Sequence, residues 1–210
     1  MIKRIIFDFD NTLIPWREEY SSTYKYALDE LNIKYNDTDL KRFEDIADNY
    51  EKYYDIFDKN IMINLINEQC QMKVPENTID VWMKYLSKCY NEEDKNIIPL
   101  LEYLSSKYEL VILSNWFRYS QVERLKGLKI DKYFKDMIYA DEVKCKPHKE
   151  AFLKAIGNHK IEECLMVGDS MKVDIGGARQ IGMDAILVDP KNNSKYKRKI
   201  KDINELKNIL

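Results

Sequence analysis

Hydrophobic positions follow three successive spacings along the chain. Residues 2–9 form a short apolar run, rich in Ile and Phe and closed by acidic residues, which predicts a buried strand. Across residues 16–95, apolar side chains recur every three or four positions, as they do on amphipathic helices, with no glycine and no alternating strand pattern. We therefore expect a small helical bundle in this stretch. Its helices are expected near residues 20–31, 40–54, 61–70 and 81–86.

From residue 98 onward, segments with strand and helix patterns alternate. Strands are expected at residues 109–113, 137–140, 164–167 and 185–188. Helices are expected near residues 100–104, 119–128, 148–156, 175–181 and 203–210. Such alternation predicts a parallel sheet that is covered by helices on both faces. The expected fold class is therefore α/β with three layers, and the helical bundle is inserted after the first strand.

The overall charge of the chain gives no reason to expect a polyanionic partner. Its 34 basic and 36 acidic residues leave a net charge of -2, so nothing attracts it generally to a nucleic acid polymer or a membrane. The basic run at residues 195–199 is expected to be a solvated loop or the start of a helix, and a polyanion-binding patch is the alternative. A chain of 210 residues can bury roughly 70% of its unfolded surface, which is enough for a sheltered site.

Targeting and redox features favour a cytoplasmic location. No stretch reaches the roughly 18 apolar residues of a membrane span, and the first apolar run stops at Asp8 without the features of a secretory signal. The cysteines lie far apart and form no CxxC pair, so we expect reduced, mostly buried thiols rather than disulfides or a zinc site. The four are Cys70, Cys89, Cys145 and Cys164.

Polar residues whose side chains could take part in catalysis or binding lie where the expected strands end. Asp8 and Asp10 close the first strand, Ser114-Asn115 closes the second, and Asp169 follows the strand at residues 164–167. In open α/β sheets, ligands bind at the carboxyl ends of the strands. We therefore expect these segments to converge on one crevice.

The aspartates predict a magnesium site in that crevice. Asp8 and Asp10 are two residues apart, a spacing that on a strand directs both side chains to the same face. Carboxylates held close together repel one another unless a cation neutralises them, and Asp169 and Asp174 would add two more. Mg²⁺ is the hard cation that fits such oxygens best when a phosphate completes its coordination. Taken singly, Asp8 and Asp10 could be a solvated strand end, and Asp174 could be a helix N-cap.

Two further segments could bind phosphate. Lys146-Pro147 stands just before a helix, where a lysine reaching the carboxylates would offset their charge and hold a phosphoryl group. Ser114 and Asn115, together with backbone N–H groups, could bind phosphoryl oxygens. Alone, Lys146 could equally be solvated, and Ser114-Asn115 could form only a turn.

The ordered set of these segments resembles the motifs of the haloacid dehalogenase-like (HAD) superfamily. The four matching segments are Asp8-Phe9-Asp10-Asn11-Thr12-Leu13, Leu113-Ser114-Asn115, Lys146-Pro147, and Gly168-Asp169-Ser170 with Asp174. Each motif is short, but their order and spacing along nearly the whole chain make the resemblance specific. It implies a Rossmann-like core at residues 1–15 and 96–210. It also implies a cap of type 1, all helical, at residues 16–95.

The resemblance also implies a role for each matching residue. Asp8 would be the nucleophile that carries an aspartyl-phosphate, and Asp10 would be the general acid and base. Mg²⁺ would be held by the Asp8 carboxylate, the Asp10 carbonyl, Asp169 and Asp174. Phosphate would be bound by Ser114, Lys146 and Asn115, and Thr12 would orient the loop or the nucleophile.

The implied activity is magnesium-dependent hydrolysis of a small phosphomonoester, such as a nucleotide, a sugar phosphate or another metabolite phosphate. A sugar-phosphate mutase on the same core is the alternative, and nothing in residues 16–95 separates the two. A haloacid dehalogenase fits less well, because that branch lacks a second aspartate like Asp10 and needs no metal. A non-catalytic binding module is also disfavoured, because every expected charged group is present. The protein could be a monomer or a homodimer.

Aromatic residues could contact the substrate. Tyrosines of the helical stretch could stack on a base or a sugar, although helical spacing is more typical of bundle core. They are Tyr20, Tyr24, Tyr50, Tyr53 and Tyr54. Trp116 and Phe117, which follow the second motif, could line the entrance or pack beneath the loop.

Overall fold

A single parallel sheet forms the centre of the computed structural model, which describes all 210 residues. Its six strands lie in the order β3-β2-β1-β4-β5-β6. They are β1 (Arg4–Phe7), β2 (Glu109–Ser114), β3 (Phe134–Tyr139), β4 (Cys164–Gly168), β5 (Asp184–Val188) and β6 (Lys199–Ile200). The expected α/β fold class is therefore confirmed. Because β1 lies between β2 and β4, the strand order reverses there, which is where ligands bind in such sheets.

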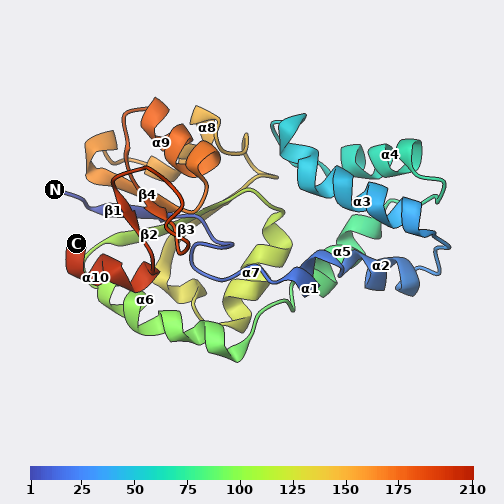
Figure 1. Ribbon diagram of the computed structural model, residues 1–210, viewed down its shortest axis with the longest axis horizontal. Coiled ribbons are helices and arrows are strands. Elements are labelled where there is room, and N and C mark those ends of the chain that lie inside the picture. The colour runs from blue at the N-terminus through green and yellow to red at the C-terminus, as the bar shows by residue number, and fades with distance from the viewer.

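Helices cover both faces of the sheet (Figure 1). One face carries α8 (Lys149–Ile156) and α9 (Gly177–Gln180), and the other carries α6 (Ile98–Ser105), α7 (Arg118–Gly127) and α10 (Leu206–Ile209). The residues of β1 alternate between the two layers, since Ile5 and Phe7 belong to one buried cluster and Ile6 to the other. A strand buried on both faces reads as a continuous apolar run, which explains the pattern of residues 2–9.

The helical insert, residues 16–95, lies beside the sheet at the end far from both chain termini (Figure 1). It contains α1 (Glu18–Ser21), α2 (Tyr24–Glu30), α3 (Asp37–Asn49), α4 (Lys59–Gln69) and α5 (Thr78–Leu86). These helices bury a hydrophobic cluster of their own, in which Phe43 stacks on Tyr24 and meets Trp82 edge-on, with ring centroids 4.5 and 5.3 Å apart. The helical periodicity predicted from the sequence is confirmed. The limits proposed for two domains stay a prediction.

Besides its two covalent connections, the insert contacts the core through the segment at residues 51–57 and through Trp82, whose ring meets that of Trp116 edge-on with centroids 5.6 Å apart. In the segment at residues 51–57, the Phe57 N–H donates to the Ala140 carbonyl at 2.8 Å, and the Cys145 N–H donates to the Asp55 carbonyl at 2.6 Å. The Asp55 carboxylate also pairs with Lys144 at 2.7 Å. The insert is thereby seated against the loop that follows β3.

The C-terminal region departs from the sequence-based expectation. Residues 195–197 form a loop as expected, but Lys199 and Ile200 are a short strand, β6, paired with β5. Two of the basic side chains are neutralised locally, because Lys199 pairs with Asp189 and Arg198 pairs with Asp184. A two-residue edge strand with a basic first residue carries no alternating apolar pattern, which is why the sequence did not predict it.

The cysteines lie in the interior of the protein, as expected. All four cysteines are free and buried. None of the helices is both long and apolar enough to span a membrane.

Asp39 is a buried carboxylate that joins two helices of the insert. It is 3% exposed, and its Oδ1 accepts hydrogen bonds from the N–H groups of Gln71 at 2.7 Å and Met72 at 3.3 Å. The segment after α4 is thus fixed to the first turn of α3. A carboxylate that satisfies several otherwise unpaired N–H groups stabilises a fold more than a surface charge does.

We expect Asp39→Ala to lower the free energy of unfolding by about 2 kcal/mol, because a buried N–H group at Met72 and a partly buried one at Gln71 lose their acceptor. Chemical denaturation followed by circular dichroism measures this change. The matched control is Asp37→Ala in the same helical turn, whose exposed carboxylate should contribute about 0.5 kcal/mol or less. Equal unfolding midpoints for Asp39→Ala and Asp37→Ala would contradict the assignment.

Candidate functional site

Three carboxylates meet at the carboxyl ends of β1 and β4. The two strands pair in parallel, with Phe7 opposite Val167, so Asp8 and Asp169 emerge side by side. Asp174 joins them from the helical turn that follows β4. One oxygen from each of these three aspartates lies within 4.8 Å of those of the other two. The convergence expected from the strand ends is therefore present in the structure.

Lys146 lies inside this cluster of three carboxylates. Its Nζ donates to Asp8 Oδ1 at 2.6 Å and to Asp174 Oδ1 at 2.7 Å, and the side chain is 1% exposed. The lysine comes from the loop between β3 and α8, which runs past the ends of the neighbouring strands. The alternative of a solvated lysine is therefore wrong.

Asp174 has a structural context that its sequence neighbours did not reveal. It lies within a π-helical turn, Met171–Gly176, and its Oδ2 accepts from the Ser170 N–H at 2.9 Å. Ser170, not Asp174, is the N-cap residue, so the alternative that Asp174 is only a cap is wrong. Gly168 makes room for this carboxylate, since a Cβ there would lie 2.4 Å from Asp174 Oδ2.

The cluster is electrostatically incomplete without a further cation. Burial raises the pKa of Asp8 to about 8, with Asp174 and Asp169 adding to the rise and Lys146 opposing it. Burial also raises the pKa of Asp169 to about 6, with Asp174 adding to it. For Lys146, burial favours the neutral amine, but Asp174 and Asp8 outweigh it and raise its pKa. A single lysine among three carboxylates leaves an excess of hard, anionic oxygens, and such a donor set fits a divalent cation such as Mg²⁺.

Asp10 is separated from the three clustered carboxylates. Strand β1 ends at Phe7, before either aspartate, so the same-face argument from strand spacing does not apply to the pair. The Asp10 carboxylate instead accepts from Arg124 Nη1 and from Gln121 Nε2, both at 2.7 Å. Its side chain is 24% exposed.

The remaining predicted residues surround Asp8 and Lys146. Thr12 Oγ1 donates to Asp8 Oδ2 at 3.1 Å, and Ser114, at the end of β2, is buried. The Asn115 side chain accepts from the Lys146 N–H and donates to the Lys146 carbonyl, both at 2.8 Å. It also donates to Glu51 of the insert at 2.7 Å. Asn115 thus holds the backbone of the lysine and connects it to the insert.

Gln121 and Arg124 contribute to the site but were not predicted from the sequence. Both are fully buried on α7, and Gln121 Nε2 donates to Ser114 Oγ at 3.0 Å as well as to Asp10. The available signal was two large polar residues three apart on the helix face that also carries buried Leu125. That pattern alone does not name a partner more than a hundred residues away.

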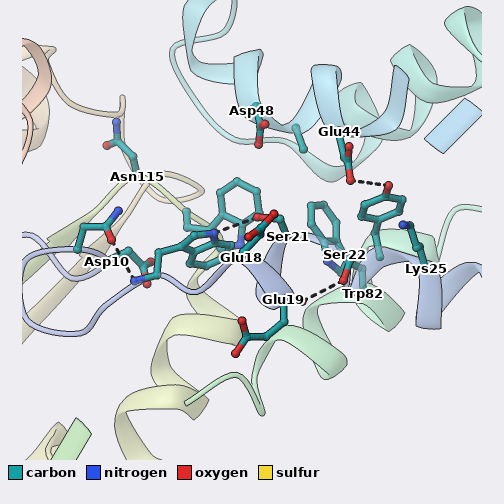
Figure 2. Close-up of a pocket in the computed structure, with 15 residues that line it drawn as sticks. Asp10, Glu18, Glu19, Ser21, Ser22, Lys25, Glu44, Asp48, Trp82 and Asn115 are labelled. Atoms are coloured by element: carbon teal, nitrogen blue, oxygen red, sulfur yellow. Dashed lines mark hydrogen bonds between the residues drawn. The ribbon is translucent and has the colours of Figure 1, made fainter. Parts of the chain in front are cut away.

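A cavity of about 900 Å³ opens between the core and the insert. Figure 2 shows its lining, in which Asp10 and Asn115 of the core face Trp82, Lys25 and Glu44 of the insert. Trp116 lines it too, whereas Phe117 is fully buried.

Of the five tyrosines considered from the sequence, Tyr24 alone lines this cavity. Tyr20 and Tyr50 are buried in the cluster of the insert. Tyr53 is 79% exposed on the surface. The bundle-core interpretation of the helical spacing therefore describes these side chains better than a row of substrate contacts.

Comparison with known proteins identifies the family. Residues 5–188 match the family model of haloacid dehalogenase-like hydrolases, so the chain belongs to this family and is an enzyme of the hydrolase class. It is 28% identical to the glyceraldehyde 3-phosphate phosphatase of Methanocaldococcus jannaschii over 90% of this chain and 85% of that protein.

Solved structures of the same family share the fold. The HAD phosphatase from Thermococcus onnurineus is similar with a TM-score of 0.71 and 27% identity, over 99% of this chain and 97% of that one. The magnesium-bound HAD-hydrolase YfnB from Bacillus subtilis is similar with a TM-score of 0.74 and 20% identity, over 100% of this chain and 98% of that one. At this identity, the likeness to YfnB concerns the fold.

We expect the metal-free protein to lose stability as the pH rises from about 4 to about 8. The folded protein holds protons on Asp8 and Asp169 at pKa values of about 8 and about 6, against an ordinary value of 3.8. It therefore binds more protons than the unfolded chain within this window, and the advantage disappears as the pH rises through the folded-state pKa values. Urea unfolding in EDTA should give a free energy at least about 1 kcal/mol higher at pH 5 than at pH 8.

Asp8→Asn should flatten this pH dependence, because the variant has no Asp8 proton to lose. The matched control is Asp184→Asn on the surface, which should leave the dependence as it is in the wild type. An unchanged slope in Asp8→Asn would show that the dependence originates elsewhere.

Proposed function

We propose that this chain is a magnesium-dependent phosphatase that hydrolyses a small phosphomonoester through an aspartyl-phosphate on Asp8. The observation that carries the proposal is the contact of Asp8 with Lys146 inside a cluster of carboxylates, beside a cavity large enough for a metabolite. A nucleophile, a fixed cation and a shielded site are the parts that phosphoryl transfer needs.

Asp8 attacks phosphorus in the first step. Its two oxygens are held by Lys146 and Thr12, which fix the direction of attack. Lys146 also favours the ionised carboxylate against the effect of burial. Ser114 and Lys146 hold the oxygens of the transferring group, and Asn115 keeps the lysine loop in place.

Asp10 acts as the general acid and then as the general base. It lines the cavity and is not part of the carboxylate cluster, so its carboxyl group can face the leaving oxygen. It donates a proton to that oxygen, and it then takes one from the water that hydrolyses the aspartyl-phosphate.

Asp8, Asp169, Asp174 and the Asp10 carbonyl would hold the magnesium ion. When bound, the ion would neutralise charge on the cluster and on the phosphoryl oxygens. A buried set of carboxylates whose pKa values are raised by desolvation and mutual repulsion supports this assignment.

The substrate class is a phosphorylated sugar or another small metabolite phosphate. The support is the similarity to a glyceraldehyde 3-phosphate phosphatase and a cavity whose walls come from both parts of the chain. We propose that residues 1–15 and 96–210 are the catalytic core and that residues 16–95 are a cap that contacts the leaving group. A cytoplasmic location and a monomeric or homodimeric state stay predictions.

We expect Asp8→Asn to abolish turnover, by at least about 1,000-fold, because a neutral amide cannot act as the nucleophile. Release of inorganic phosphate from p-nitrophenyl phosphate with Mg²⁺ measures it, and circular dichroism checks that the variant folds. EDTA should abolish phosphate release by the wild type, and added Mg²⁺ should restore it. Full activity in Asp8→Asn or in EDTA would overturn the mechanism or the metal requirement, respectively.

We expect the wild type to release inorganic phosphate from triose or hexose phosphates in a panel of phosphorylated metabolites. The measurement pairs a phosphate assay with identification of the organic product. A mutase would instead interconvert isomeric sugar phosphates and release little phosphate. That result would contradict hydrolysis and favour the mutase.

A further inference from the structure

Arg124 is a fully buried cation that contacts Asp10 and both segments that join the insert to the core. Its side chain is 0% exposed, and its Nη1 donates to Asp10 Oδ1 at 2.7 Å and to Gln121 Oε1 at 2.8 Å. Its Nη2 is buried without a hydrogen-bond partner. Burying a guanidinium with one nitrogen unsatisfied costs stability, so packing alone does not account for an arginine here.

The same guanidinium touches both segments that join the helices of the insert to the core. They are the outgoing segment, residues 8–17 between β1 and α1, and the returning segment, residues 87–97 between α5 and α6. On the returning segment, its Nε donates to the Cys89 carbonyl at 2.8 Å. On the outgoing segment, it lies over the rings of Phe9 and Trp16, 4.7 and 5.5 Å from their centroids. One side chain therefore fixes the position of Asp10 relative to both connections.

Gln121 completes the support on the other oxygen of Asp10. Because its Oε1 accepts from Arg124, its amide is oriented so that Nε2 faces Asp10 Oδ2 at 2.7 Å and Ser114 Oγ at 3.0 Å. Each oxygen of the Asp10 carboxylate thus has its own donor.

We propose that Arg124 and Gln121 are positioning residues that aim the Asp10 carboxyl group at the leaving oxygen and fix it relative to both connections of the insert. The proposal rests on the proposed function of Asp10 as the acid and base. In the first step, an Asp8 oxygen bonds to phosphorus, the ester P–O bond breaks, and the Asp10 proton moves to the leaving oxygen. In the second step, water oxygen bonds to phosphorus, the Asp8–phosphorus bond breaks, and Asp10 takes the water proton.

The test separates proton delivery from the attack of Asp8. An alkoxide needs a proton in order to leave, whereas p-nitrophenolate leaves without one, so misalignment of Asp10 should slow the first step only with alkyl esters. Arg124→Met should lower kcat for glycerol 3-phosphate by about 100-fold. With p-nitrophenyl phosphate it should keep the rate of the first p-nitrophenolate release and show a burst of about one per site, because hydrolysis of the intermediate becomes slow.

Two further variants keep the test decisive if Arg124→Met folds poorly. Gln121→Leu should give the same split between the two esters, and Arg124→Lys, which keeps the charge but has fewer donors, should recover part of the activity on glycerol 3-phosphate. Stopped-flow absorbance and phosphate release measure both esters with Mg²⁺ present.

The matched control is Arg4→Met, at the opposite ends of the strands. Arg4 is also buried and paired, with Glu109 at 2.6 Å, so its loss costs stability without touching Asp10. Its ratio of rates on the two esters should equal that of the wild type. If Arg124→Met slows both esters equally without a burst, or matches the wild type, the positioning role is wrong. A wild type that releases no phosphate, or an active Asp8→Asn, would instead overturn the proposed function.

Discussion

The arrangement of the site depends on charge compensation among buried groups. Asp8, Asp169 and Asp174 are brought within a few ångströms of one another by the geometry of β1 and β4 and by a π-helical turn. Lys146 alone cannot neutralise them, and carboxylates in a poorly solvated site are stable only when cations or bound protons offset their charge. The neighbouring features serve this requirement: Gly168 admits Asp174, Thr12 contacts Asp8, and Asn115 holds the lysine loop.

A second layer of contacts connects this cluster to the rest of the molecule. Asn115 joins the lysine loop to Glu51 of the insert, and Arg124 joins Asp10 to both connecting segments. Asp8 and Asp10 are therefore held by different supports. Asp8 is held by Lys146, whose loop Asn115 fixes at the end of β2. Asp10 is held by Gln121 and Arg124 of α7.

Periodicity predicted the fold well, and short motifs predicted the cluster, for different physical reasons. The strands of the sheet and the helices of the insert are buried along their length, so the spacing of their apolar residues predicts them. Asp8, Asp169 and Lys146 follow from the rule that polar strand ends meet at one edge of a parallel sheet. The resemblance to a known family then placed Asp174, which local sequence alone could have made a helix cap.

Other features depend on contacts that no local pattern encodes. Gln121 and Arg124 acquire their partner through the packing of α7 against the loop after β1, and β6 is too short to show any period. The expectation that Asp10 would share a face with Asp8 failed because β1 ends earlier than its apolar run suggests. Sequence spacing predicts orientation only as far as the strand continues.

The seating of the insert at residues 51–57 has a consequence for the timing of catalysis. Any movement that draws the insert away from the core must first break the backbone hydrogen bonds of Phe57 and Asp55, the Asp55 ion pair and the contact between Glu51 and Asn115. The insert therefore stays seated until these contacts and the edge-on packing of Trp82 on Trp116 are lost together. Substitutions at Asp55 are therefore expected to change how quickly the cavity exchanges its contents with solvent, whereas a substitution at Glu51 would also reach Asn115, which holds the Lys146 backbone.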